Sequence, residues 1–191
     1  MLTQLILFIL DAVIGFFSIL LIARFMMQWQ RVSFRNQLGA FIVAATDWAV
    51  LPTRRVVPGL FGLDLSSFVL AWLAQTLLVL VEFWLRDLPV GNAPGAAVLV
   101  VALLGVIATI KMMLYVLIGA VIIAAVLSWV NPYSPVAPIF NALTRAFLAP
   151  VQRVIPPIAN VDLSPLVLLL ILQVILVLVA YLRASVVQLL A

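Results

Sequence analysis

The sequence predicts an all-α membrane protein with four transmembrane helices in two parallel repeats. Each repeat is expected to hold an amphipathic helix and a connector rich in proline and arginine. The chain is 68% hydrophobic and 8% charged, with a mean hydropathy of +1.38. Globular domains are roughly half apolar and about a quarter charged. A soluble fold of 191 residues could not bury so much apolar surface, so lipid must cover it.

The repeat is visible as a connector segment that occurs twice, 98 residues apart. Matches at six polar or proline positions carry the argument, because Val and Leu matches are common in so apolar a chain. The matched pairs are Pro52 and Pro150, Arg55 and Arg153, Pro58 and Pro156, Asp64 and Asp162, Ser66 and Ser164, and Gln75 and Gln173. The breaker cluster between Arg86 and Gly95 places the boundary, which predicts repeat 1 over 1–95 and repeat 2 over 96–191.

Repeat 1 begins with an apolar run over 5–29, which is long enough to cross a bilayer. An amphipathic helix capped by Ser33 is expected to follow and to stop at Pro52, because the residue before a proline disfavours helix. The second span is predicted over 65–85, with Asp64 or Ser66 capping its first backbone N–H groups. Glu82 and Arg86 lie four residues apart at its far end and are expected to pair.

Repeat 2 is expected to follow the same order, with spans over 105–129 and 163–182. Residues 96–104 are read as a helical extension or an interfacial piece, since a separate crossing would invert the repeat. A second amphipathic helix should end before Pro150. Ser164 is the expected cap of the last span, with Pro165 at the first helical position, where proline is tolerated.

Arginines give the predicted orientation. The positive-inside rule assigns the basic connectors of both repeats to the cytoplasm and both termini to the outside. Few basic residues lie near the other ends of the spans. The connector arginines are Arg31, Arg35, Arg54, Arg55, Arg145 and Arg153.

Each connector contains an arginine and an aspartate nine residues apart, Arg55 with Asp64 and Arg153 with Asp162. One interpretation is a cytoplasmic vestibule or a docking surface for a partner or a lipid phosphate. The other is a structural ion pair that holds the start of the span. The arginines could also hold anionic lipid headgroups, at about 1 kcal/mol each near the surface.

Four polar residues fall inside the spans. Gln75 and Gln173 either face each other across the pseudo-twofold axis and line a polar path, or form interhelical hydrogen bonds worth about 0.6–2 kcal/mol. Asp11 and Lys111 occupy equivalent positions with opposite charge. Since a charge inside a membrane requires a partner, they either pair near the outer face or reach the interface separately.

Several kinds of chemistry are not expected. The chain contains no cysteine or histidine, which removes disulfides, thiolate or imidazole metal sites and histidine-dependent triads. Asp64 and Asp162 could be mistaken for a protease dyad, but they lie at the heads of spans rather than within them. We therefore expect no enzyme activity, no metal and no cofactor. The net charge of +4 rests on few groups and does not predict direct nucleic-acid binding.

The second connector, Pro150…Arg153…Pro156…Asp162-Leu163-Ser164-Pro165, preceded by Asn131-Pro132, resembles the mark of the YGGT family. Repeat 1 departs from it, because Ser67 replaces the last proline and the Asn-Pro pair is absent. The resemblance implies a multi-pass protein of the bacterial inner membrane. Family members are linked to osmotic stress and ion uptake, to cell division or envelope organisation, and in plastids to nucleoid distribution and cytochrome assembly.

Two functional hypotheses follow. The first is a non-enzymatic scaffold or assembly factor for envelope, division or membrane-complex machinery, with membrane-protein partners or self-association. The second is a small channel or transporter that affects ion flux in osmotic stress. The sequence offers only two glutamines near the middle of the membrane, which favours the scaffold.

Overall fold

The computed structural model describes residues 1–57, 59, 64–86, 94–155 and 162–188. In this part of the chain there are six helices and no strands. Four helices are long and apolar enough to cross a membrane, which confirms the predicted all-α fold with four spans. The helices are α1 (Leu2–Trp29), α2 (Gln37–Thr53), α3 (Leu65–Leu85), α4 (Pro94–Val130), α5 (Ala137–Val154) and α6 (Ser164–Gln188).

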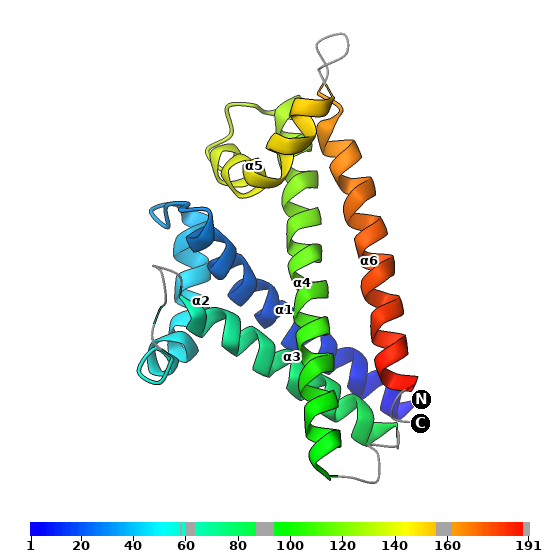
Figure 1. Cartoon of the computed structure of the whole chain (residues 1–191). Helices are drawn as coiled ribbons and strands as arrows, with labels where there is room; N and C mark the ends of the chain where they lie inside the picture. Colours follow the sequence, from blue (N-terminus) through cyan, green and yellow to red (C-terminus); the bar gives the residue numbers. More distant parts are fainter. Residues whose placement is uncertain (58, 60–63, 87–93, 156–161, 189–191) are drawn as a thin grey trace.

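Figure 1 shows the two repeats running in the same direction. Helices α1 and α4 lead away from the end of the molecule that holds the N-terminus, and α3 and α6 return to it. The short helices α2 and α5 lie at the opposite ends of the hairpins, which we call the elbows. Helix α3 packs against both α1 and α4, and α4 also packs against α6, so α3 and α4 join the repeats. The division at residue 95 stays a prediction.

The start of α2 differs from the predicted one. Asn36, rather than Ser33, caps the helix, because its side-chain oxygen accepts the Gly39 N–H at 2.7 Å. The hydroxyl of Ser33 instead accepts the Arg35 N–H at 3.2 Å. Arg31, with φ of 54°, adopts a left-handed conformation as the chain leaves α1. The bend between α1 and α2 therefore uses the residues that were expected to begin the helix.

Both prolines expected to stop the amphipathic helices lie inside them, Pro52 in α2 and Pro150 in α5. The prediction was wrong because a proline removes only its own N–H donor. The next turn still forms, as Arg54 N–H donates to Val50 O and Ile155 N–H donates to Val151 O, each at 3.0 Å. One missing hydrogen bond at an exposed helix end costs less than the whole last turn.

Residues 96–104 form a helical extension of α4, which settles the choice between the two readings of this segment. Val101 and Leu104 are buried in a cluster with Val79 and Phe83 of α3 and Val186 of α6. At 1.5 Å per residue, the 37 residues of α4 reach roughly 55 Å against a hydrocarbon core of ~30 Å. Helix α4 must therefore tilt or extend beyond the core.

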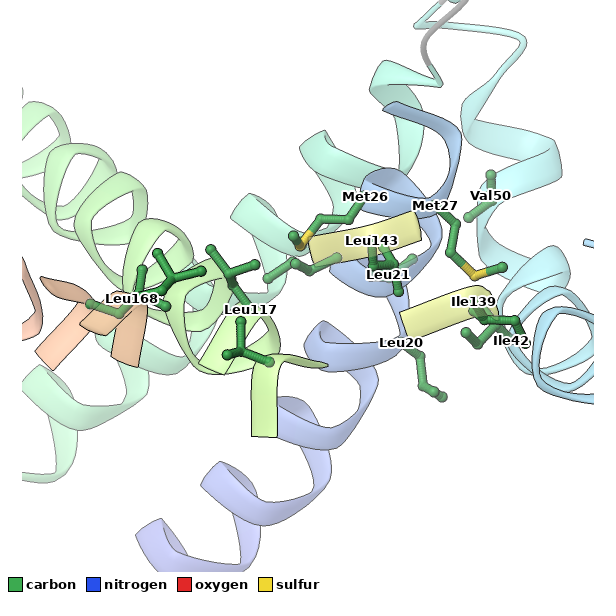
Figure 2. Packing of buried hydrophobic residues seen from close by; sticks show 14 residues of the cluster. Leu20, Leu21, Met26, Met27, Ile42, Val50, Leu117, Ile139, Leu143 and Leu168 are labelled. Atoms are coloured by element: carbon green, nitrogen blue, oxygen red, sulfur yellow. The ribbon is translucent and has the colours of Figure 1, made fainter. Parts of the chain in front are cut away.

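The larger apolar cluster joins the two elbows (Figure 2). In this cluster Ile139 of α5 lies near Met27 of α1 and Ile42 of α2, and Leu143 lies near Leu21 of α1. The rings of Trp29 and Phe147 meet edge to face, with centroids 5.9 Å apart. Helix α5 of repeat 2 is thus packed against side chains of repeat 1 as well as against its own spans.

The two repeats approach closely at Gly105 of α4. A Cβ atom there would lie 2.9 Å from the Cβ atom of Thr76 in α3 and 3.1 Å from its Cα atom. One turn away, the Trp72 indole N–H donates to the Ala102 carbonyl at 3.1 Å. Glycine at position 105 therefore allows the two helix backbones to come together.

Replacing this glycine should separate the repeats. Gly105→Ala is expected to destabilise the protein by about 1–3 kcal/mol, the usual cost of overpacking. Gly119→Ala is the matched control in the same helix, because its Cβ would meet nothing within 4 Å. Thermal unfolding in detergent micelles compares the two. Equal unfolding temperatures for both variants would contradict this account of the α3–α4 contact.

Candidate functional site

Asp64 is the centre of the elbow of repeat 1. It lies directly before α3, and its side chain is 5% exposed. Its Oδ2 atom accepts from Arg54 Nε at 3.0 Å and from Ser67 Oγ at 3.2 Å. Its backbone N–H donates to the side-chain oxygen of Gln28 at 3.0 Å. Through these hydrogen bonds Asp64 links the segment after α2 to the start of α3 and the end of α1.

Arg24 completes this network from inside α1, where it is 3% exposed. Its Nη1 atom donates to Thr46 Oγ1 and to Asp47 Oδ1, each at 2.7 Å. Its Nε atom lies 3.9 Å from Asp64 Oδ2. Two arginines and two aspartates therefore balance in one compact group, which we call the charged elbow (Arg24, Asp47, Arg54 and Asp64). A buried arginine without partners would cost several kcal/mol, so its acidic partners are required for this fold.

The electrostatics of the charged elbow favour ionised side chains. Burial alone would raise the pKa of Asp64, but the hydrogen bond and the charge of Arg54 lower it below the ordinary value. The same hydrogen bond to Asp64 raises the pKa of Arg54. Both groups are therefore charged at neutral pH.

The predicted partner of Asp64 was wrong by one residue. Arg55 is exposed, and Arg54 makes the ion pair. The predicted caps of α3 are also absent, since the Asp64 carboxylate faces Arg54 and the Ser66 hydroxyl donates to Val57 O at 2.9 Å. Both side chains are occupied by the connector instead.

The elbow of repeat 2 repeats this shift. The side-chain N–H of Gln152, rather than Arg153, donates to Asp162 Oδ2 at 2.9 Å, and Arg153 makes no ion pair with any described residue. Gln152 stands 98 residues after Arg54, so equivalent positions contact the two aspartates. Asp162 also accepts the Ser164 N–H at 2.8 Å and so supports the start of α6.

The predicted cap at Ser164 is wrong. Its buried hydroxyl has no hydrogen-bond partner among the described residues. Burial tends to raise the pKa of Asp162, but hydrogen bonds from the Ser164 backbone N–H and the Gln152 side chain lower it. Pro165 follows at the second helical residue of α6. Pro58 and Pro156 lie outside the described residues.

The two membrane glutamines do not face each other. Gln75 is buried and its side-chain N–H donates to Ser18 Oγ of α1 at 2.9 Å, which confirms the interhelical hydrogen bond for this residue. Gln173 is exposed on α6. The prediction that the two glutamines line a shared polar path is therefore wrong. The equivalent faces of α3 and α6 do not meet in this structure.

Asp11 and Lys111 do not form an ion pair in this structure. The Lys111 ammonium lies 5.4 Å from the ring centre of Tyr115, one turn along the same helix, and Asp11 is exposed. Lys111 instead makes a cation–π contact within its own helix. Both residues nevertheless line one cavity of about 620 Å³ between α1, α3, α4 and α6.

Glu82 provides the main charge contacts of this cavity, which we call the terminal cavity. It lies 3.5 Å from Arg86, which confirms the predicted pair, and 2.6 Å from Arg183 of α6. The second contact ties repeat 1 to repeat 2 and was not predicted. No group of three or more acidic side chains that could hold a metal ion occurs in the described segments.

The ion pair between Arg24 and Asp47 was not predicted, although the sequence contains a signal for it. Arg24 lies within an apolar run, and a charge inside a span requires a partner. Asp47 is the acidic residue of the following amphipathic helix. The roles of Pro52, Pro150, Arg153 and the other connector residues in contacting a partner stay predictions.

The fold and the paired elbows define a multi-pass α-helical membrane protein built from two parallel repeats. The CCB3/YggT family model matches residues 3–85 and 103–183, so the chain belongs to this family. This confirms the resemblance and the two-part repeat. No solved structure matches the chain significantly.

Three similar proteins come from Gram-negative bacteria, and each is named as an uncharacterized protein. A Pseudomonas aeruginosa protein is 34% identical over 170 residues, which is 88% of this chain and 84% of the relative. A Vibrio alginolyticus protein is 32% identical over 167 residues, covering 87% and 88%. YggT of Escherichia coli is 29% identical over 170 residues, covering 88% and 85%.

Two adjacent arginines allow a matched test of the charged elbow. Arg54→Ala should destabilise the protein by about 1 kcal/mol, a value reduced because Arg54 is partly exposed to solvent. Arg55→Ala should leave stability unchanged, because Arg55 is exposed and makes no ion pair within the described residues. Thermal unfolding in micelles measures both. A larger loss in Arg55→Ala would show that the ion pair is assigned to the wrong residue.

Acid should weaken the charged elbow. Because the folded-state pKa of Asp64 is lowered, its contribution is complete above the ordinary value of about 3.9 and is lost as pH falls through the lower folded value. Unfolding temperatures between pH 6 and pH 3 should fall less steeply in Asp64→Asn than in the native chain. Asp162 also has a lowered pKa, so part of the dependence should remain. An unchanged slope in Asp64→Asn would contradict the assignment.

Proposed function

We propose that the protein is a non-enzymatic scaffold or assembly factor of the membrane, with its elbows as the contact surfaces for other membrane proteins. The observation that carries the proposal is an apolar layer between its polar regions. On α4, Lys111 lines the terminal cavity and Ala124 lines a second cavity at the elbow. These residues are roughly 20 Å apart along the helix.

Apolar side chains fill the space between the two cavities. Leu117 and Val121 of α4 are buried and pack with Leu168 and Leu172 of α6 and Leu21 of α1. Gln75, the buried glutamine of the spans, is already bonded to Ser18. The packed apolar side chains of this layer offer an ion no group to replace its water, which argues against a continuous path.

The elbows, in contrast, present large side chains outward. Trp48 of α2 is 70% exposed and Phe41 lies exposed on the same helix. Tyr133, before α5, is also exposed. Exposed aromatic side chains are common at sites of protein contact and at membrane interfaces. The charged elbow holds α2 in place, so Trp48 and Phe41 are presented in one orientation.

We further propose that both elbows face the cytoplasm of a bacterial inner membrane. The connector arginines and the Gram-negative source of the relatives support this placement. The chain has no cysteine, so single cysteines report topology directly. Arg145→Cys should react with a membrane-impermeant maleimide only in inverted vesicles, and Leu2→Cys only in intact spheroplasts. The reverse pattern would refute the orientation.

The scaffold function predicts specific neighbours at the elbows. A photo-crosslinking amino acid at position 48 or 133 should give discrete adducts with membrane proteins in living cells. Position 84 is the matched control, because Trp84 is 78% exposed, against 70% for Trp48, but lies at the far end of α3. Adducts of the same pattern and yield at all three positions would show that contact is non-specific.

The terminal cavity favours a second candidate, a protein that conducts ions or small solutes. Its volume of about 620 Å³ and its lining by Glu82, Arg86, Lys111 and Arg183 would suit a charged solute. Purified protein in liposomes tests this, and the scaffold predicts no flux above that of empty vesicles. Flux that is lost in Gln75→Leu and kept in Gln173→Leu would favour the channel, because Gln75 lines this cavity and Gln173 does not.

A further inference from the structure

A cavity of about 330 Å³ lies in the elbow of repeat 2. Ala124, Ser128, Trp129, Gln152, Asp162 and Pro165 are among the residues that line it. We call it the elbow cavity. Its lining comes from α4, α5 and the start of α6, the counterparts of the three elements that the charged elbow joins in repeat 1.

The duplication shows what has changed between the two elbows. Trp29 and Trp129 align the first spans of the repeats, so Ala124 stands at the position of Arg24 and Ser128 at that of Gln28. The connectors align 98 residues apart, so Gln152 stands at the position of Arg54. The aspartate is kept, as Asp64 and Asp162, while both of its arginines are replaced by smaller neutral side chains.

The loss of the arginines leaves the second carboxylate without a cation. Asp162 takes part in none of the ion pairs of the described residues and accepts only from the neutral groups of Gln152 and Ser164. A carboxylate offers about four acceptor positions, so capacity remains. Arg145, at the position of Asp47, is exposed and does not line the elbow cavity.

One further feature points to a cationic ligand with N–H donors. The Trp129 indole at the cavity wall offers an aromatic face, to which guanidinium and ammonium groups are attracted. A planar guanidinium suits a carboxylate because it donates two parallel hydrogen bonds.

We propose that the elbow cavity binds a guanidinium or primary ammonium group that takes the place of Arg24 in repeat 1. The group comes either from an arginine or lysine side chain of a partner polypeptide or from a small organic cation. The first source would make the elbow cavity a contact point of the proposed scaffold. The cavity itself does not depend on that function.

The experiment uses the full chain in nanodiscs of neutral lipid with 5-fluorotryptophan at its five tryptophans. The fluorine resonance of Trp129, assigned with Trp129→Phe, is followed during titration with methylguanidinium. We expect a saturable shift with a dissociation constant in the millimolar range or tighter. The Trp29 resonance should not move, because Arg24 occupies the equivalent place. Tetramethylammonium, which has the charge but no N–H donors, should cause no saturable shift.

Two variants separate the elbow cavity from general effects. Asp162→Asn keeps an oxygen that can accept the Ser164 N–H, so α6 should still start, yet affinity should fall at least tenfold. Ala124→Arg supplies the guanidinium from the chain itself, so it should abolish the titration and raise the unfolding temperature. Ala124→Met controls for side-chain size and should not raise it.

To identify the source of the cation, the titration is repeated with a capped peptide that contains one central arginine. Affinity at least tenfold above that of methylguanidinium would assign a polypeptide partner, and equal or weaker affinity a small cation. The proposal is overturned if Trp129 does not respond, if Asp162→Asn binds equally well, or if Ala124→Arg is no more stable than Ala124→Met. None of these results depends on crosslinking at the elbows, so the scaffold function would be judged separately.

Discussion

The guanidinium of Arg24 is the constraint on which the first half of the molecule depends. It is buried in α1 and held by Thr46 and Asp47 of α2, with Asp64 at the start of α3 nearby. Because a buried charge is stable only with opposite charges beside it, three elements must meet at one point. The amphipathic helix and the return into the second span are therefore positioned by electrostatics as well as by apolar contact.

The two repeats show how one backbone plan tolerates different chemistry. Thr46 and Thr144 are equivalent, are buried, and bond the carbonyl one turn before them. Around this shared feature the elbows diverge, since repeat 1 fills its interior with charge and repeat 2 leaves a cavity beside Asp162. Apolar packing at Ile139 and Leu143 holds the second elbow against the first, so it does not rely on an ion pair of its own.

Some features that depend on local sequence were predicted correctly, whereas several contacts between distant residues were not. The bounds of α3 were predicted correctly because a long apolar run between a polar cluster and a breaker cluster is a local property. The choice between Arg54 and Arg55 was wrong because neighbouring side chains point in different directions, and nothing local says which one faces Asp64. The prediction that Gln75 and Gln173 face each other was wrong, because equivalent positions in a duplicated sequence need not meet.

The sequence by itself determined the membrane class, the four spans, the duplication and the family, because these depend on composition and on short-range pattern. Tertiary structure alone decided which charges meet, as with Arg24 and Asp47 or Glu82 and Arg183, and where cavities remain. The physical reason is that ion pairs and cavities depend on distances between helices. These distances are set by contacts such as Gly105 against Thr76, which lie far apart along the chain.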